Sequence, residues 1–247
     1  MFTVWHLFVY PASNAYNSYF DKDKGSIGGL KHPPKVSVFL YYTSLVLEFT
    51  AILLSSIIGL NLVLAVFFYG LISKAYSHPV IRLKKYPFLS WFIVTVFQGY
   101  FVFVANTWIW SEEVLITEWR IQLPAVASSL FLMSNYPLTQ IYQHQEDKLR
   151  GDNTISITLG IIGTFRFSAL FFLLGTLVLW YFFISIDKPV MGLLFQIATF
   201  PVVVYFLRWF SSVKRNLELA DFHHTMTMIK LSSLCLSIFF LVWWIYC

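Results

Sequence analysis

Residues 161–185 read IIGTFRFSALFFLLGTLVLWYFFIS, an almost unbroken apolar run with one charged residue, Arg166. A helix rises about 1.5 Å per residue, so about 20 apolar residues cross the hydrocarbon core of a bilayer. Similar runs recur on both sides of this one, separated by short polar connections. We therefore predict an all-α, polytopic transmembrane bundle of eight helices, at roughly 1–20, 36–58, 60–76, 88–110, 121–144, 161–185, 190–209 and 226–247.

The composition supports this fold class. Of the 247 residues, 58% are hydrophobic and 12% are charged, whereas about 25% of the residues in soluble domains are charged. No linker, low-complexity tract or sequence repeat divides the chain, so we predict that residues 1–247 form a single domain. A net charge of +5 would suggest a nucleic-acid partner for a soluble protein. In a chain surrounded by membrane lipid it indicates orientation instead, and we expect no nucleic-acid partner.

Basic residues separate between the two ends of the predicted helices. With the loops numbered alternately, 15 of the 17 Lys and Arg residues lie in or beside the loops 21–35, 74–87, 145–160 and 210–225. The other face keeps Arg120 and Lys188 beside four acids, Glu112, Glu113, Glu118 and Asp187. The positive-inside rule makes the first face cytoplasmic. We therefore expect a multi-pass protein of the cell inner membrane with both termini outside.

A first polar group lies at the cytoplasmic end of the first predicted helix. Asn14, Asn17 and Asp21 are spaced i, i+3 and i+7, so they share one face of that helix. Polar groups stacked in a membrane helix are costly unless they face the interior of the bundle or a water-filled cavity. The group indicates either a site within the bundle or a solvated helix end followed by a lysine-rich loop.

A second polar group repeats this spacing at the end of the fifth predicted helix. Gln140, Gln143 and Asp147 again stand at i, i+3 and i+7. Mg²⁺ is a hard cation that prefers oxygen ligands and often binds one or two carboxylates together with substrate phosphates. Two matched polar faces with carboxylates suit Mg²⁺ held between them. The alternative is a coincidence of spacing combined with ordinary interfacial polarity.

The first of these segments resembles an aspartate motif of the UbiA superfamily of intramembrane prenyltransferases. That motif is Asn-Asp-x-x-Asp-x-x-x-Asp in the family. Asn17 and Asp21 match it, whereas Ser18 and Gly25 replace two of its acids. The segment 76–84, which reads YSHPVIRLK, is similar to the basic loop that follows the family's fourth helix.

The second segment resembles the second motif of the same family, Asp-x-x-x-Asp followed by Gly-x-x-Thr-Leu and a Gly. Asp147, Gly151, Thr154 and Gly160 agree with it, and Gln143 stands where the leading Asp belongs. The similarity covers almost the whole chain. The family has nine helices, so we expect that this chain lacks the family's first helix.

The resemblance implies an Mg²⁺-dependent transferase that moves an isoprenyl group from its diphosphate to a hydrophobic acceptor, aromatic or a quinone precursor. Its catalytic residues would be Asp21 and Asp147. The implied metal ligands are Asp21, Asp23, Glu146 and Asp147, with Asp152 as a further acid nearby. Either Asp23 and Glu146 take over from the acids lost at Gly25 and Gln143, or the site holds fewer metal ions than in the family. The isoprenyl diphosphate would be held by Asn14, Asn17, Arg82, Lys84, Gln143 and Lys148.

Two other functions stay open at this point. A UbiA-like terpene cyclase would form the same allylic cation and capture it within the same molecule. A transporter or a non-catalytic membrane protein belongs to a different class. The chain shows no internal repeat and no pair of interrupted helices at mid-membrane, which argues against a transporter.

Three further polar positions have two interpretations each. Glu48 lies in the middle of the second helix and is either a functional residue or a neutral carboxyl bonded to a neighbouring helix. His144 is either a ligand or base beside the second motif or a structural histidine. The pair His223–His224 has no metal-ligand spacing and is interpreted as an interfacial feature.

Overall fold

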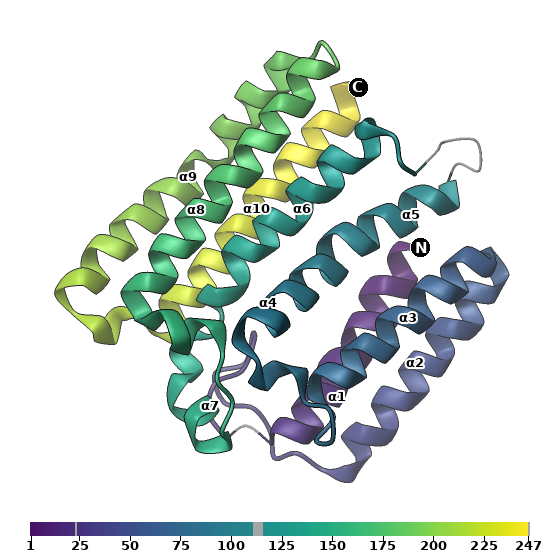
Figure 1. Ribbon diagram of the computed structural model, residues 1–247, viewed down its shortest axis with the longest axis vertical. Coiled ribbons are helices and arrows are strands. Elements are labelled where there is room, and N and C mark those ends of the chain that lie inside the picture. The colour runs from purple at the N-terminus through teal and green to yellow at the C-terminus, as the bar shows by residue number, and fades with distance from the viewer. Residues whose placement is uncertain (23, 111–115, 247) are drawn as a thin grey trace.

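The computed structural model describes residues 1–22, 24–110 and 116–246 (Figure 1). In these ranges the chain is helical, and a lone bridge between Ile27 and Leu30 is the only extended pairing. As predicted, this part of the chain forms eight membrane-length segments: η1 (Val4–Val9) with α1 (Tyr10–Asp21), α2 (Val38–Ile58), α3 (Leu60–Ser77), α4 (Pro87–Val96) with η3 (Phe97–Phe101) and α5 (Val102–Trp110), α6 (Trp119–Leu138), α8 (Ile155–Ser185), α9 (Pro189–Arg215) and α10 (Phe222–Tyr246). The shorter elements are η2 (Leu83–Lys85), η4 (Ile141–Gln143), α7 (His144–Arg150) and η5 (Leu217–Leu219).

The long helices run back and forth between two ends of the bundle (Figure 1). Judged by length and composition only, six of the eight segments, all but α1 and α6, are long and apolar enough to cross a membrane. Both termini lie at one end of the bundle, and α7 with the α1–α2 and α9–α10 connections lies at the other. That second end carries most of the lysines and arginines, and we call it the basic end. The chain is an integral membrane protein.

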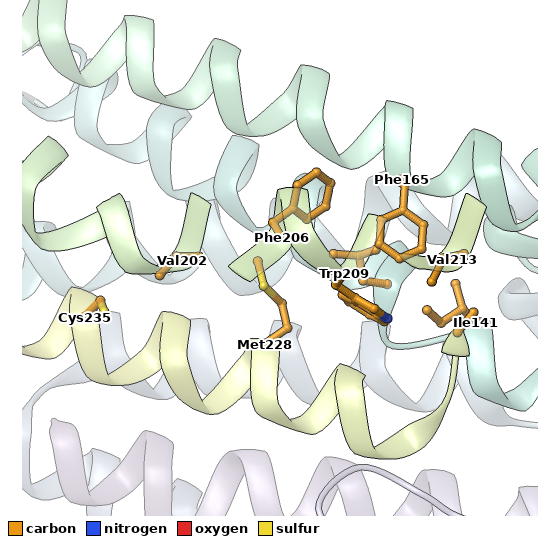
Figure 2. Close-up of a cluster of buried hydrophobic side chains, with 10 residues drawn as sticks. Ile141, Phe165, Val202, Phe206, Trp209, Val213, Met228 and Cys235 are labelled. Carbon is orange, nitrogen blue, oxygen red and sulfur yellow. The ribbon is translucent and has the colours of Figure 1, made fainter. Parts of the chain in front are cut away.

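Aromatic packing holds α8, α9 and α10 together near the basic end (Figure 2). The fully buried ring of Phe165 from α8 stacks on Phe210 from α9, with ring centroids 5.0 Å apart. It meets the edge of Trp209 at 4.7 Å. Phe206 and Met228 extend the same cluster between α9 and α10. Such close packing is the main force between helices in lipid, where exclusion from water no longer favours association.

The π-helical turn η3 approaches α6 closely at Gly99. A Cβ atom added to Gly99 would lie 2.7 Å from the backbone of Ser129, so no larger residue fits there. The hydroxyl of Ser129 accepts a hydrogen bond from the backbone N–H of Tyr100 at 2.8 Å and donates to the carbonyl of Thr95 at 3.1 Å. This contact fixes α4 and α5 against α6, the helix that leads into the second motif.

The fifth helix ends earlier than predicted, at Leu138 instead of residue 144. Pro137 cannot donate the helical hydrogen bond to the carbonyl of Met133, four residues before it. That carbonyl instead accepts a hydrogen bond from the indole N–H of Trp91 in α4 at 3.2 Å. The second motif therefore does not continue α6. It lies on the 3₁₀ turn η4 and on the separate helix α7.

The sixth segment is interrupted near its start. We predicted a helix from residue 161, whereas α8 begins at Ile155 and is broken at Gly160, which has φ 68° and ψ 167°. A positive φ of this size suits glycine because it has no Cβ atom. Thr164 donates its hydroxyl hydrogen to the carbonyl of Gly160 at 2.8 Å and supports the kink. The kink directs the first turn of α8 toward the second motif.

Candidate active site

The basic end of the bundle contains a cavity of about 450 Å³ that is bounded by α1, α3, α4, η2, α7 and the end of α6. The residues that line its polar part include Asn14, Asn17, Asp21, Lys84, Gln143, Asp147, Arg150 and Asp152. The apolar and aromatic lining includes Tyr69, Ile72, Tyr76, Ile93, Val94, Phe97 and Tyr136. One cavity thus joins charged groups to a wall suited to a hydrocarbon chain.

The first wall is the last part of α1. Asn14, Asn17 and Asp21 all line the cavity, so this helix face is turned into the bundle as their spacing indicated. Ser77, at the end of α3, donates to the side-chain oxygen of Asn17 at 2.6 Å and orients that amide. The helix ends after Asp21 because Lys22 adopts a left-handed conformation with φ 51°. Asp21 is therefore held by the final turn of a packed helix.

The loop between α3 and α4 brings two cations to the cluster. Arg82 binds Asp152 with two parallel hydrogen bonds, Nε to Oδ1 at 2.8 Å and Nη2 to Oδ2 at 2.9 Å. Lys84 forms an ion pair with Asp21, and its Nζ lies 3.8 Å from Oδ2 of Asp152. Lys84 is 4% exposed, so burial lowers its pKa, while the charges of Asp152 and Asp147 oppose that effect.

The third wall is α7 and the turn that follows it. Arg150 pairs with Asp147 three residues earlier, and its Nε lies 3.3 Å from Oδ2 of Asp152. Gly151 adopts a left-handed conformation with φ 76° and ends α7. The N–H of Asp152 then donates to the carbonyl of Asp147 at 2.9 Å. This C-terminal cap brings two aspartates that are five residues apart to the same place.

Three aspartates and three cations thus neutralise one another around the polar part of the cavity. We call Asp21, Asp147, Asp152, Arg82, Lys84 and Arg150 the charge cluster. Burial raises the pKa of Asp147 to about 7, the charges of Asp152 and Glu146 add to the rise, and Lys84 opposes it. Added positive charge in the cavity would favour the ionised form of Asp147. Binding of a metal cation there would therefore release protons in the neutral pH range.

The glycine-rich loop after α1 docks on the second motif. The backbone N–H of Gly25 donates to Oε1 of Glu146 at 2.6 Å, and Nε2 of Gln143 donates to the carbonyl of Ser26 at 3.1 Å. A Cβ atom added to Gly25 would lie 2.8 Å from the Glu146 carboxylate. An acid at position 25, as in the family motif, would require the flexible Glu146 side chain to move.

The structure places the predicted site residues in three groups. Six line the cavity: Asn14, Asn17, Asp21, Lys84, Gln143 and Asp147. Arg82 and Glu146 do not line the cavity; Arg82 contacts Asp152, which does line it, and Glu146 contacts Gly25. Lys148, a predicted diphosphate ligand, is exposed and does not line the cavity. Asp23 lies outside the described residues.

Two members of the charge cluster were not assigned a role from the sequence. Arg150 was counted only as a marker of orientation, and Asp152 only as an additional acid. The signal that identifies them is the left-handed glycine between them, because Gly151 turns Asp152 back toward Asp147. The pairing of Asp152 with Arg82 joins positions 70 residues apart, and such a contact leaves no trace in local spacing.

The oxygen donors of the cavity fit an Mg²⁺ ion whose coordination is completed by substrate phosphates. No group of three or more His, Cys, Asp or Glu among the described residues is arranged to hold a metal ion. Mg²⁺ often uses one or two carboxylates and completes its shell with water and substrate phosphates. Asp21 and Asp147, with the amide oxygens of Asn17 and Gln143, supply that kind of donor set. The residues therefore fit Mg²⁺ bound together with a diphosphate.

The remaining polar candidates lie apart from the charge cluster. Glu48 forms an ion pair with Lys74 of the neighbouring helix α3. His144 shares a hydrogen bond of 2.8 Å with the hydroxyl of Ser156. His224, in the first turn of α10, contacts Asp221 at 2.8 Å. Each of these groups has a structural partner, and none of them lines the cavity.

Comparison with known proteins identifies the family. No curated protein and no solved structure gives a significant match to the chain. The profile of the UbiA prenyltransferase family matches residues 1–234, which include both polar segments, the basic loop and seven of the eight long helical segments in full. The match, the membrane-spanning helical bundle and the polar cavity agree, and the chain belongs to the UbiA prenyltransferase family.

Proposed function

We propose that this chain transfers an isoprenyl group from its diphosphate to a lipid-soluble acceptor, aromatic or a quinone precursor, with Mg²⁺ as cofactor. The observation that carries the proposal is the charge cluster beside an aromatic-lined cavity within a membrane bundle. We also propose that the basic end faces the cytoplasm and that the membrane is the cell inner membrane, because lysine and arginine are enriched in cytoplasmic loops.

The charge cluster supports diphosphate binding by exchange of partners. Without ligand, Asp21 and Asp152 pair with cations of the loop between α3 and α4, and Asp147 pairs with Arg150 of its own helix. An arriving diphosphate is an alternative partner for Lys84 and Arg150, both of which line the cavity. Their release would free the carboxylates of Asp21 and Asp147 to act as metal ligands. Buried charges therefore remain paired before and after binding, which avoids the cost of an isolated buried charge.

The reaction breaks the bond between the allylic carbon and the diphosphate oxygen, and the oxygen keeps the electron pair. Mg²⁺, when bound, supplies charge stabilisation at the diphosphate oxygens. Lys84 and Arg150 would stabilise the same developing negative charge. The acceptor then forms the new bond to the allylic carbon and loses a proton. Tyr76, Phe97 and Tyr136 would surround the cationic carbon with aromatic faces and exclude water.

Product analysis with a radiolabelled isoprenyl diphosphate tests the proposal. The protein in lipid nanodiscs is given the diphosphate, Mg²⁺ and a set of lipid-soluble aromatic acceptors. We expect an acceptor adduct that disappears when EDTA removes Mg²⁺. A cyclised hydrocarbon in place of an adduct would identify a terpene cyclase. Recovery of unchanged diphosphate under every condition would contradict enzymatic function.

Substitutions in the two walls assign the reaction to this cavity. Asp21→Asn and Asp147→Asn keep the shape of the side chain and remove the charge that would ligate Mg²⁺, so we expect turnover to fall at least about 100-fold in each. Asp187→Asn is the matched control, because Asp187 lies at the opposite end of the bundle between α8 and α9. Comparable losses in all three variants would argue against this site.

A further inference from the structure

A second cavity, of about 180 Å³, lies on another face of α6, among α6, α8, α9 and α10. No residue that lines it also lines the cavity of the charge cluster. From α6 it takes Phe131, Ser134, Asn135 and Leu138, whose spacing of three and four residues defines one helix face. The two cavities are thus separate sites that share a helix between them.

The wall of the second cavity is apolar and rich in aromatic rings. Phe131, Phe172 and Phe206 reach it from three different helices, and none of its lining residues is charged. Val202, Phe206 and Met228 of this wall also belong to the packed cluster drawn in Figure 2. A ring bound among three phenyl groups can adopt offset or edge-to-face contacts, which are the favourable arrangements for aromatic pairs.

Two hydroxyl groups in this apolar wall have no hydrogen-bond partner among the residues that the structure describes. Ser168 of α8 is 1% exposed and Ser232 of α10 is 7% exposed, and the Oγ atom of each is buried without a bond within the described chain. Other hydroxyls of the same wall are satisfied, since Ser134 donates to the carbonyl of Ser168 at 2.8 Å and Thr199 to that of Phe195 at 2.8 Å. A buried donor without a partner is costly and calls for an acceptor from elsewhere.

The size and the opening of the cavity limit what that acceptor can be. A cavity of about 150 Å³ lined by apolar side chains holds a benzene molecule, whereas one water molecule takes up about 30 Å³ and would leave most of such a space empty. Ala169 and Leu207, which also line the cavity, are exposed on the membrane-spanning helices α8 and α9. The cavity therefore opens toward lipid, and its occupant enters from the membrane.

We propose that this second cavity binds a lipid-soluble, ring-sized molecule that carries a hydroxyl or carbonyl oxygen, with Ser168 and Ser232 as its hydrogen-bond partners. The six-membered ring fills the space between the phenylalanines, and the oxygen accepts from the two serines. The inference does not depend on the transferase reaction, because it uses none of the residues of the charge cluster.

Phenol and toluene test the proposal, since they have nearly the same shape and differ in the polar oxygen. Their affinities are measured from the rise in unfolding temperature of the intact protein in nanodiscs, at matched concentrations in the bilayer. We expect phenol to bind at least about tenfold more tightly than toluene, because two hydrogen bonds are gained. Equal affinities, or no binding of either compound, would overturn the proposal.

Variants locate the binding. In Ser168→Ala/Ser232→Ala we expect phenol affinity to fall to that of toluene, while toluene binding stays unchanged. The unliganded variant should unfold at the same or a higher temperature, because it loses two unpaired buried hydroxyls. Ser185→Ala is the control, since Ser185 bonds the carbonyl of Tyr181 and lies outside the cavity. Ala169→Trp, at the opening, should block both compounds. Preference for phenol that survives in the double variant would contradict the proposal.

Discussion

At the scale of single residues, the polar part of the cavity is held together by ion pairs between buried carboxylates and cations. Asp152 is the centre of the charge cluster, because it binds Arg82 with two hydrogen bonds and also contacts Arg150 and Lys84. It is 3% exposed, so its charge is shielded from water and balanced by these cations alone. Asp21 and Asp147, the two acids predicted to be catalytic, line the same cavity as Asp152.

Removal of the Asp152 carboxylate should destabilise the fold more than removal of an exposed acid. Asp152→Ala removes the carboxylate that binds Arg82 and also contacts Arg150 and Lys84, and loss of one member of a buried pair costs about 3–5 kcal/mol. Asp221→Ala removes a half-exposed acid that accepts from the backbone N–H and the ring of His224 at the start of α10, where loss of such a helix cap costs about 0.5–2 kcal/mol. Unfolding temperatures of both variants in the same nanodiscs measure the difference. Equal effects would show that the cluster does not contribute to stability.

At the scale of helices and turns, the structure corrects the sequence-based prediction in an informative way. The i, i+3, i+7 spacing of Gln140, Gln143 and Asp147 suggested one continuous helix, yet Pro137 ends α6 before them. All three still line the cavity, because η4 and α7 turn the chain toward it. Periodicity predicted which residues gather there, whereas the geometry that gathers them depends on a proline and on the Trp91 indole of another helix.

The close approach of η3 to α6 makes a specific prediction about glycine. Gly99→Ala would place a methyl group 2.7 Å from the Ser129 backbone and force the helices apart. Overpacking of this kind costs about 1–3 kcal/mol, so the unfolding temperature should fall. Gly28→Ala is the matched control, because nothing lies within 4 Å of a Cβ atom at Gly28. A neutral effect of Gly99→Ala would mean that the contact is loose in the membrane.

At the scale of the whole molecule, the number and order of the long helices could be predicted from apolar runs together with the alternating charge of the loops. Runs of this length have one stable conformation in lipid, because a helix satisfies all of its own backbone hydrogen bonds. The alternation of basic and acidic loops also predicted that positive charge gathers at one end of the bundle. Contacts between distant segments, such as Arg82 with Asp152 and Gly25 with Glu146, could not be predicted from one sequence.

The two ends of the bundle should label from opposite sides of the membrane. In a variant without native cysteines, we expect Gly28→Cys, in the loop after α1, to react with an impermeant maleimide only from the cytoplasmic side. Thr117→Cys, just before α6, should react only from the other side. The acidic stretch next to it, with Glu112 and Glu113, lies outside the described residues. Labelling of both positions from one side would contradict the up-and-down topology.

The exposed lysines at the basic end are expected to affect the association rate of an anionic ligand more than its dissociation rate. Lys22, Lys24, Lys31, Lys35 and Lys148 are exposed there, whereas the buried charge cluster is balanced. Surface charges accelerate the encounter with an anion, and salt screens them over about 10 Å at 0.1 M. Stopped-flow mixing with a fluorescent isoprenyl diphosphate should therefore show an association rate that falls with ionic strength and a dissociation rate that barely changes. The enzyme would then be limited by encounter in concentrated salt while its bound ligand remains as long-lived as before.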